Sequence, residues 1–431
     1  MILLSEKSGK RESVVRNRSV HPRVVLFQRA LPVYRVPIFQ RLFKRLQGAL
    51  YVVHGSVVTL GAAETVDGFK HRETGYHESS KLGLAMYSGH ITLPLRGIYD
   101  VAVFAWEARC ATLPLAIARC RMAGLGVVLW GQGFSKSSSK SIGKLVRNQV
   151  ALAADAIVVY DDETAKNLQQ LGKPVFVARN TIQVPQAQRL RARDLRSHRL
   201  SQAESKTFQK RPLSVIVCTR LQQRNRIDLL ADASKLYAET YGPIKVTLIG
   251  ADHWPGGIKS LRGRFGSAEW RVLGPIYDPD RLANLYANAD LAVVPDAVGL
   301  SLIHALAHGV PFITAAGLGP HGPEFSALKN GQNGLLYIRG DSNSLCEMLF
   351  RGKSFQFLQD AGHAAADTYD GRYSPSAMVD GLMAAIYKSH WRRFQKSDEN
   401  WSYYDIVDTQ LGLYHAGNGG NNKNAKLQKN N

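Results

Sequence analysis

The sequence holds two successive series in which short apolar runs alternate with segments of helical periodicity. The first series begins at Arg23 and the second at Leu213. Such alternation is typical of parallel strands joined by crossover helices. We therefore predict an α/β fold of two doubly wound Rossmann-like domains that face a cleft, with ligands bound beyond the carboxyl ends of the strands. The runs interpreted as strands are Val24–Gln28, Leu50–His54, Val101–Phe104, Gly126–Trp130, Ala156–Tyr160, Val175–Val177, Leu213–Cys218, Ile244–Ile249, Trp270–Val272, Leu291–Val294, Pro311–Thr314 and Leu335–Tyr337.

These series set the predicted domain boundaries. The first domain covers residues 23–182 and the second covers residues 212–374. Between them, at 183–211, the apolar pattern disappears and Arg and Lys greatly outnumber Asp and Glu. We interpret this stretch as an exposed basic linker, partly helical, that either stays solvated or binds anions. The remaining segments are a basic N-terminal tail at 1–22, a terminal helical segment at 375–416 and a disordered tail rich in Gly, Asn and Lys at 417–431.

The composition excludes several classes of protein. A hydrophobic fraction of 45% in 431 residues is enough for two packed cores. No apolar run reaches the length of about 18 residues that a membrane-spanning helix needs. The four cysteines are scattered without the spacing of metal ligands, which indicates reduced thiols and a cytoplasmic location.

The net charge of +21 favours an anionic partner. Nucleic acid, an anionic membrane surface and phosphate-bearing substrates all fit this charge, but no zinc-finger spacing or aromatic RNA-binding signature supports nucleic acid. Residues Val36–Leu46 form a basic amphipathic pattern, which suits either a helix at an anionic bilayer or a helix packed on its sheet. Peripheral attachment at the inner face of the membrane is therefore one expectation.

The stretch from Asp296 to His308 has the pattern of an anion site. It follows the apolar run Leu291–Pro295, and helical periodicity begins after a turn that contains glycine. Asp296 and His304 flank the start of this helix and offer hydrogen bonds to hydroxyl groups. Such a site suits a sugar diphosphate. The first N–H groups of the helix have no partners within it and suit a phosphate oxygen; they belong to Gly299, Leu300 and Ser301.

Ordered motifs in the second half resemble the donor-binding domain of family 4 retaining glycosyltransferases, which have the GT-B fold. The first half resembles the acceptor domain of that family more loosely. The matching elements are Cys218–Leu221, Arg224–Leu230, Thr247–Gly250, Leu273–Gly274, Leu285–Asp290, Val294–Pro295, Gly309–Pro311 and Gly331–Leu336 in the second half, and Pro32–Gln40, Leu129–Gly133 and Asn180–Ile182 in the first.

The resemblance implies a donor site built on cations and backbone N–H groups. Arg220 directly follows a strand, where its guanidinium can engage two phosphate oxygens as the leaving group gains charge. The resemblance also implies a second cation from Arg224 or Arg226, although both equally suit a solvated helix start. Glu324 matches an acidic position of the family after the next strand, and it equally suits charge complementarity at a helix start. No Asp-x-Asp motif lies in a suitable turn, so we expect no metal and no cofactor.

Two parts of the sequence depart from the family pattern. The family places paired glutamates where this sequence has Asp296 and His304. By resemblance, the first position holds donor-sugar hydroxyls and the second holds the nucleotide ribose. Gln132 stands where some relatives have a histidine, and a glutamine can orient an acceptor hydroxyl but cannot take its proton. In a retaining transfer the leaving phosphate can take that proton. His54 ends a strand and is either a group beside the cleft or a satisfied structural histidine.

We therefore predict a retaining, metal-independent glycosyltransferase that moves a sugar from a nucleotide-sugar donor to a glycan or lipid-linked acceptor in cell-surface polysaccharide biosynthesis. The expected catalytic residues are Arg220, Asp296 and Gln132. The alternatives are a nucleotide-sugar 2-epimerase of the same fold and a catalytically silent GT-B module for binding or assembly. The expected donor-binding residues are Arg224, Arg226, Gly299, Leu300, Ser301, His304 and Glu324.

Overall fold

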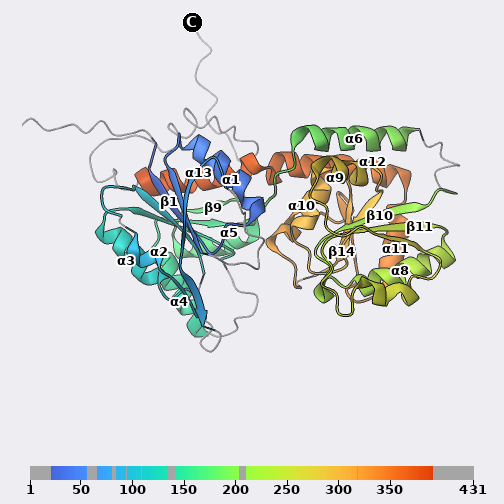
Figure 1. The fold of residues 1–431 in the computed structure, drawn as a ribbon, viewed down its shortest axis with the longest axis horizontal. Helices are drawn as coiled ribbons and strands as arrows, with labels where there is room; N and C mark the ends of the chain where they lie inside the picture. The colour runs from blue at the N-terminus through green and yellow to red at the C-terminus, as the bar shows by residue number, and fades with distance from the viewer. Residues whose placement is uncertain are drawn as a thin grey trace, which may run out of the picture.

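The chain forms two α/β units that lie next to each other (Figure 1). Each unit has a parallel sheet with helices on both faces, which confirms the predicted pair of doubly wound domains. Most of the predicted N-terminal tail, the end of the terminal helical segment and the predicted disordered tail lie outside the described residues. The computed structural model describes residues 21–55, 66–79, 84–93, 95–107, 109–133, 141–202, 210–317 and 319–391.

The sheet of the first domain has the strand order β3-β2-β1-β6-β7-β8-β9, and its neighbouring strands are parallel. Every residue of β7 and β8 is buried, as expected for parallel strands that are covered on both faces. The strands are β1 Val24–Gln28, β2 Leu50–Gly55, β3 Lys70–Thr74, β6 Val101–Ala105, β7 Gly126–Trp130, β8 Ala156–Val159 and β9 Val175–Val177, and β4 Tyr76–Ser79 forms an antiparallel hairpin with β5 Leu84–Tyr87.

Helices cover both faces of this first sheet (Figure 1). One face carries α1 (Val36–Arg45) and α13 (Pro375–Trp391), so the C-terminal end of the described chain completes the first domain. The other face carries α2 Gly89–Thr92, α3 Leu113–Met122, α4 Ser141–Leu152 and α5 Asp162–Leu168.

The apolar face of α1 belongs to the core. Ile38, Phe39 and Leu42 are fully buried, and the helix packs against α13. Arg45 on the other side of α1 forms an ion pair with Asp380 of α13 at 3.0 Å. The expectation that this helix lies on a bilayer is therefore wrong, because its apolar side chains are already used for packing. In the part of the chain that the structure describes, no helix is long and apolar enough to cross a membrane.

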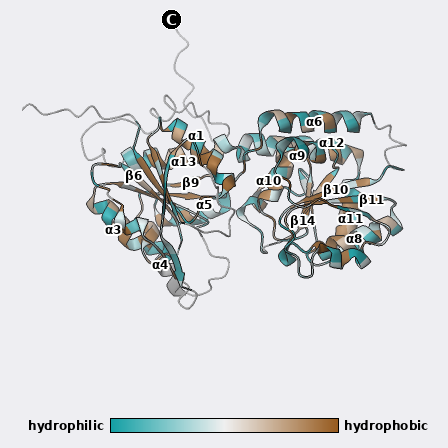
Figure 2. Ribbon diagram, viewed as in Figure 1, coloured by the Kyte–Doolittle hydropathy of each residue, from teal (hydrophilic) through white to brown (hydrophobic). Residues whose placement is uncertain are grey.

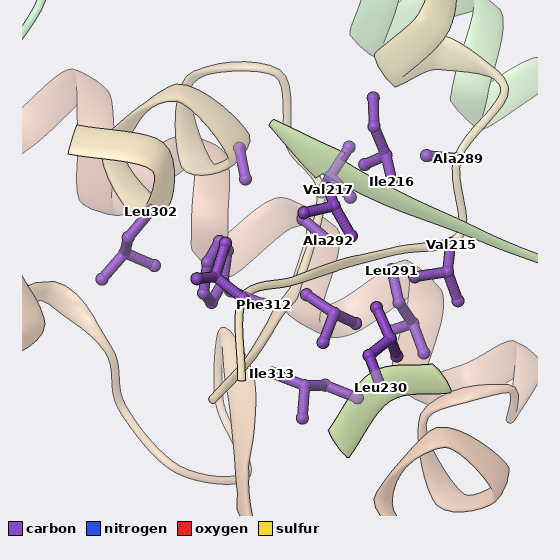
Figure 3. Close-up of a cluster of buried hydrophobic side chains, with 14 of the residues drawn as sticks. Val215, Ile216, Val217, Leu230, Ala289, Leu291, Ala292, Leu302, Phe312 and Ile313 are labelled. Atoms are coloured by element: carbon purple, nitrogen blue, oxygen red, sulfur yellow. The ribbon is translucent and has the colours of Figure 1, made fainter. Parts of the chain in front are cut away.

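The sheet of the second domain has the order β12-β11-β10-β13-β14-β15. Apolar side chains from its central strands, among them Val215, Leu291 and Phe312, meet in one core (Figure 3). The strands are β10 Leu213–Cys218, β11 Ile244–Ile249, β12 Glu269–Val272, β13 Leu291–Val293, β14 Phe312–Ala315 and β15 Gly334–Tyr337.

Two groups of helices cover the second sheet on opposite faces (Figure 1). One group is α8 Ile227–Thr240 and α11 Ser342–Gly352, and the other is α9 Pro279–Ala287, α10 Leu300–Ala307 and α12 Phe355–Thr368. Short 3₁₀ segments occur at Val33–Arg35, Gln169–Leu171, Gln223–Asn225, Ile258–Arg264 and Pro323–Ala327, and a π-helical turn at Tyr369–Tyr373.

The stretch predicted as an exposed linker contains a helix that packs on the second domain. This helix, α6, spans Gln186–Ser201 and contacts α9. It is largely hydrophilic (Figure 2), yet Arg196 is buried and donates to the backbone carbonyls of Leu358 and Asp290 at 3.1 and 3.2 Å. Arg193 forms an ion pair with Asp370 at 2.6 Å. The interpretation of residues 186–201 as a solvated connection is therefore wrong, since arginines bind this helix to the domain.

Candidate functional site

The strand order of the second sheet reverses between β10 and β13. In open parallel sheets, ligands bind beyond the carboxyl ends of the strands at such a point. Arg220 follows β10 and Asp296 follows β13, so the fold brings these two predicted residues to the same switch point. The carboxyl edges of the two sheets face each other, because Asn180 after β9 donates a hydrogen bond to Glu324 after β14.

Arg220 is exposed and carries an uncompensated charge. Within the described ranges, no acidic side chain forms an ion pair with it. The backbone before it is held by a close approach to Gly250. Gly250 has a φ of +147°, and a Cβ there would lie 1.7 Å from the carbonyl oxygen of Thr219. Only glycine fits, so the turn that ends the following strand fixes the position from which Arg220 projects.

The other two predicted cations differ from each other. Arg226 forms an ion pair with Asp228 at 2.9 Å, so its charge is already balanced. Arg224 is exposed, and its Nε donates to the amide oxygen of Gln222 at 2.8 Å. Backbone and side-chain bonds join this loop to the switch point, since the N–H of Asp296 donates to the carbonyl of Asn225 at 3.2 Å. Arg224 therefore remains a candidate second cation, whereas Arg226 pairs with Asp228 in the first turn of α8.

Asp296 is buried, and its carboxylate is held by a residue that the sequence did not suggest. Arg339 Nη1 donates to both carboxylate oxygens, at 2.5 and 2.6 Å. The N–H of Ala297 donates to the same carboxylate at 2.9 Å. Arg339 lies just after β15, at the same edge of the sheet. A donor-sugar role for Asp296 remains a prediction, and it requires the sugar to share this carboxylate with Arg339.

The amino end of α10 keeps its anion-binding character. Gly299 is the N-cap, and no hydrogen-bond acceptor contacts the N–H groups of Gly299, Leu300 or Ser301 within the described ranges. The buried Glu324 lies beside it, because its Oε2 is 4.0 Å from where a Cβ of Gly299 would stand. Its other oxygen accepts from Asn180 of the first domain. Glu324 thus links the helix start to the first domain, and its contact with the donor stays a prediction.

The ring of His304 packs inside the domain. It contacts the rings of Tyr286 and His308, each with a centroid separation of 5.0 Å, and its Nδ1 lies 3.9 Å from the Sγ of Cys218. Burial, reinforced by His308, holds the pKa of His304 well below its usual range. The ring is therefore neutral at physiological pH and offers a hydrogen bond but no charge. Its expected contact with a ribose remains a prediction.

Gln132 lies in the first domain, just beyond the carboxyl end of β7. It is exposed and stands between two glycines of a tight turn. Gly133 has a φ of +72°, and a Cβ there would lie 2.6 Å from Cγ2 of Thr164. The turn presents Gln132 at the edge that faces the second domain, while residues 134–140 lie outside the described ones.

Arg35 is a second residue that sequence reasoning missed. It follows β1, and its guanidinium lies 4.6 Å from the ring centroid of Trp130 and donates to the hydroxyl of Tyr160 at 3.3 Å. Its Nη1 is buried without a hydrogen-bond partner among the described residues. The motif Pro32–Gln40 had suggested only a strand-to-helix turn, so the aromatic surroundings of this cation were not foreseen.

His54 belongs to a pair of imidazoles at the end of β2. Its Nε2 lies 3.2 Å from Nδ1 of His71, and its burial lowers the pKa of His54. Among the described residues, no group of three or more His, Cys, Asp or Glu side chains is placed to hold a metal ion.

Comparisons with known proteins identify this architecture. Residues 212–351 match the family model described as glycosyl transferases group 1. The solved structure of HepE from Anabaena in complex with UDP is 14% identical, with 84% of this chain and 99% of that chain covered at a TM-score of 0.57. Sucrose-phosphate synthase from Thermosynechococcus elongatus is 16% identical, with 87% and 99% covered at 0.58. A glycosyltransferase from Rickettsia africae is 12% identical, with 88% and 100% covered at 0.60.

No curated protein sequence matches this chain. At identities this low the solved structures show the fold alone, and the family model covers only the second domain. The chain therefore has the GT-B fold, and its residues 212–351 form a glycosyl transferases group 1 domain.

Proposed function

We propose that the protein is a retaining, metal-independent glycosyltransferase that moves a sugar from a nucleotide-sugar donor to a glycan or lipid-linked acceptor in cell-surface polysaccharide biosynthesis. The observation that carries this proposal is the exposed Arg220, which forms no ion pair with any described residue, at the switch point that also holds the amino end of α10. A nucleoside diphosphate gains negative charge as its bond to the sugar breaks. Fixed cations and N–H donors aimed at that charge stabilise the transition state without a metal.

The nature of the donor is supported by similarity. The Anabaena protein HepE has been solved in complex with UDP and glucose, and it shares the fold of this chain. UDP-sugars are therefore the first donors to test. Arg220 and Arg224 supply the cations for the diphosphate in this proposal, and the N–H groups of Gly299, Leu300 and Ser301 supply its backbone donors.

The experiment follows nucleotide release from a panel of nucleotide sugars by the purified full-length protein, with and without saccharide acceptors. We expect turnover with one donor class and a loss of donor affinity of at least about 10-fold in Arg220→Ala, since a charge-assisted bond to phosphate is worth about 1.5–3 kcal/mol. Arg271→Ala on the exposed edge strand β12 is the matched control. Absence of donor binding across the panel, or unchanged affinity in Arg220→Ala, contradicts the proposal. Analysis of the released sugar without acceptor separates transfer from 2-epimerisation.

A catalytically silent binding or assembly module is the second candidate. Asp296 and His304 occupy the two positions where the family has glutamates. The first is paired with Arg339 and the ring of the second packs against Tyr286, and both observations favour this candidate. Tight donor binding without release of nucleotide under any acceptor condition would support this candidate over the enzyme.

A further inference from the structure

The first sheet has its own switch point, between β1 and β6. Arg29 follows β1, and Glu107 follows β6 after one intervening residue, so both stand beyond carboxyl ends where such sheets bind ligands. The hairpin β4–β5 brings two tyrosines and a second carboxylate to the same place. We call these residues the switch-point cluster: Arg29, Tyr76, Glu78, Tyr87 and Glu107.

Hydrogen bonds, an ion pair and ring contacts join the cluster into one unit. The hydroxyl of Tyr87 donates to Glu107 Oε2 at 3.2 Å, and the hydroxyl of Tyr76 donates to Glu78 Oε2 at 2.9 Å. Arg29 forms an ion pair with Glu78 at 3.3 Å, and its guanidinium lies 5.5 Å from the ring centroid of Tyr76. The rings of Tyr76 and Tyr87 meet edge to face at 4.9 Å.

The hairpin is pressed against the end of β2 at Gly55. A Cβ on Gly55 would lie 2.7 Å from the carbonyl oxygen of Arg29 and 2.7 Å from the Cβ of Tyr76. No other residue fits without displacing one of the two. The packing therefore fixes the relative positions of Arg29 and Tyr76, and the cluster is a preorganised group.

Several polar groups of the cluster lack partners. Among the described residues, Tyr87 provides the one side-chain hydrogen bond to Glu107, so Glu107 Oε1 remains an open acceptor. Arg29 Nε and the indole N–H of the adjacent Trp106 are buried without hydrogen-bond partners there. Unpaired buried donors are rare in folded proteins and indicate a bound water or ligand. Among the described residues, the cluster therefore holds one open acceptor, on the half-buried Glu107, and one buried donor without a partner, on Arg29.

The chemistry of the cluster selects a hydroxyl-rich ligand. Two carboxylates against one arginine make the cluster acidic, so it disfavours a phosphate or another anion. Carboxylates accept hydrogen bonds from hydroxyls, the guanidinium donates to hydroxyl oxygens, and a tyrosine ring packs against the C–H face of a sugar. A carbohydrate meets all of these requirements.

We propose that the switch-point cluster binds a sugar acceptor and that Glu107 is a catalytic residue, whose free carboxylate oxygen receives the proton of the attacking hydroxyl. The acceptor oxygen attacks the anomeric carbon of the donor sugar on the face from which the phosphate departs, so the configuration is retained. The new bond from oxygen to carbon forms, the bond from that carbon to the phosphate oxygen breaks, and the phosphate leaves with the electron pair. The inference rests on the proposed transferase function and assigns the acceptor class and a base to it.

The electrostatic surroundings of Glu107 agree with this role. Burial raises the pKa of Glu107 and Glu78 raises it further, whereas Arg29 and the hydroxyl of Tyr87 act in the opposite direction. Burial also raises the pKa of Tyr76 to about 12, and it raises the pKa of Tyr87 and of Cys110, so these three neighbours stay neutral. A carboxyl with a raised pKa is a stronger proton acceptor near neutral pH than an exposed one.

The test uses full-length Glu107→Gln and Tyr87→Phe in the assay for transfer to saccharides. Glutamine keeps the size of the side chain but takes no proton, so we expect transfer to saccharides to fall about 100-fold or more while the affinity for the donor, which the other domain binds in this proposal, is retained. Tyr87→Phe removes a bond that favours the ionised carboxylate, so we expect the acidic limb of the rate profile to move to higher pH. Glu347→Gln, exposed on α11, is the control for loss of a surface charge.

Specific results overturn the proposal. If Glu107→Gln keeps the wild-type rate and the wild-type acidic limb, the proton goes elsewhere, for example to the leaving phosphate. If Tyr87→Phe has the unfolding midpoint of the wild type and its acidic limb does not move, Glu107 is likewise not the group that takes the proton.

A binding measurement separates this proposal from the proposed function. Saturation-transfer NMR with a panel of mono- and oligosaccharides needs no donor and no turnover. If no nucleotide sugar is used but saccharide binds and Glu107→Gln weakens it at least about 10-fold, the cluster is a sugar site and the transferase function fails. Absence of saccharide binding to the wild-type protein overturns the sugar site itself.

Discussion

Removal of the cation that pairs with Asp296 is predicted to weaken the turn between β13 and α10. In Arg339→Met, the carboxylate of Asp296 keeps its buried position but loses both bonds from Arg339 Nη1, at 2.5 and 2.6 Å. The carbonyl oxygens of Ala316 and Gly317 lose their bonds from Arg339 Nη2 at 3.1 and 3.2 Å. The substitution therefore leaves the buried charge of Asp296 without its cation, with the N–H of Ala297 still donating to it, and removes the bonds from Arg339 to two carbonyls.

The magnitude follows from the exposure of the pair. Removal of one partner from a fully buried pair costs about 3–5 kcal/mol, whereas a fully exposed pair is worth about 0–1 kcal/mol. The side chain of Asp296 is 12% exposed and that of Arg339 is 31% exposed, so the pair lies between these limits. We expect Arg339→Met to lower the local stability of this region by about 2 kcal/mol.

Hydrogen exchange followed by mass spectrometry measures this effect in peptides that cover residues 291–317. It reports local opening and does not require a two-domain chain to unfold in one step. A double-mutant cycle with Asp296→Asn isolates the pair, and we expect a coupling free energy of about 1–2 kcal/mol. If the effects of the two single substitutions simply add to within about 0.5 kcal/mol, the reasoning about this pair is refuted. The same variants test the predicted contact between Asp296 and the donor sugar. If the carboxylate contacts the donor, we expect Asp296→Asn to change the affinity for the nucleotide sugar when it is added to Arg339→Met; otherwise the affinity stays the same.

Three further outcomes are expected. Gly250→Ala places a methyl group against the carbonyl of Thr219, so we expect it to lower the unfolding midpoint. Because it also moves the turn before Arg220, we expect a lower donor affinity, measured by calorimetry. Burial raises the pKa of Asp290, but hydrogen bonding and the charges of Arg211 and Arg199 outweigh it and hold the pKa below its usual range. The ionised Asp290 therefore stabilises the fold above its unfolded pKa, and this contribution is lost as the pH falls through its folded pKa. We expect Asp290→Asn to reduce this loss of stability at acidic pH, measured by urea titrations at several pH values. Leu42→Ala should cost about 2–5 kcal/mol of stability and leave recovery with anionic vesicles in flotation unchanged, because the side chain is in the core.

The sequence was most informative where strands are buried on both faces. β1, β7 and β10 consist largely of apolar residues, and their positions were predicted to the residue. β3 was missed because its residues are Lys, His, Arg, Glu and Thr at an exposed edge, which is a pattern typical of a loop. α6 was taken for a linker because its arginines bind carbonyls and carboxylates of the domain, and periodicity of apolar residues does not reveal such contacts.

The candidate site was predictable in part for the same reason. Arg220 and Asp296 follow apolar runs directly, so their place at a carboxyl edge follows from the strand pattern alone. Arg339 and Glu107 also follow strands, but their partners are set by the strand order, which the sequence leaves open. Arg339 meets Asp296 because β15 and β13 both flank β14, and Glu107 meets Arg29 because β6 lies beside β1.

The two switch points differ in charge, and this difference bears on how two substrates are kept apart. In the second sheet, Arg220 and Arg224 form no ion pairs with the described residues, which favours a diphosphate. In the first sheet, Glu78 and Glu107 outweigh Arg29, which disfavours a diphosphate and suits hydroxyls. Under the proposed function, a nucleotide sugar is therefore drawn to the second sheet and repelled from the switch point of the first. Since the two edges face each other through Asn180 and Glu324, the proposal then has the donor sugar point towards the acceptor site, with the same charge pattern that separates the two substrates.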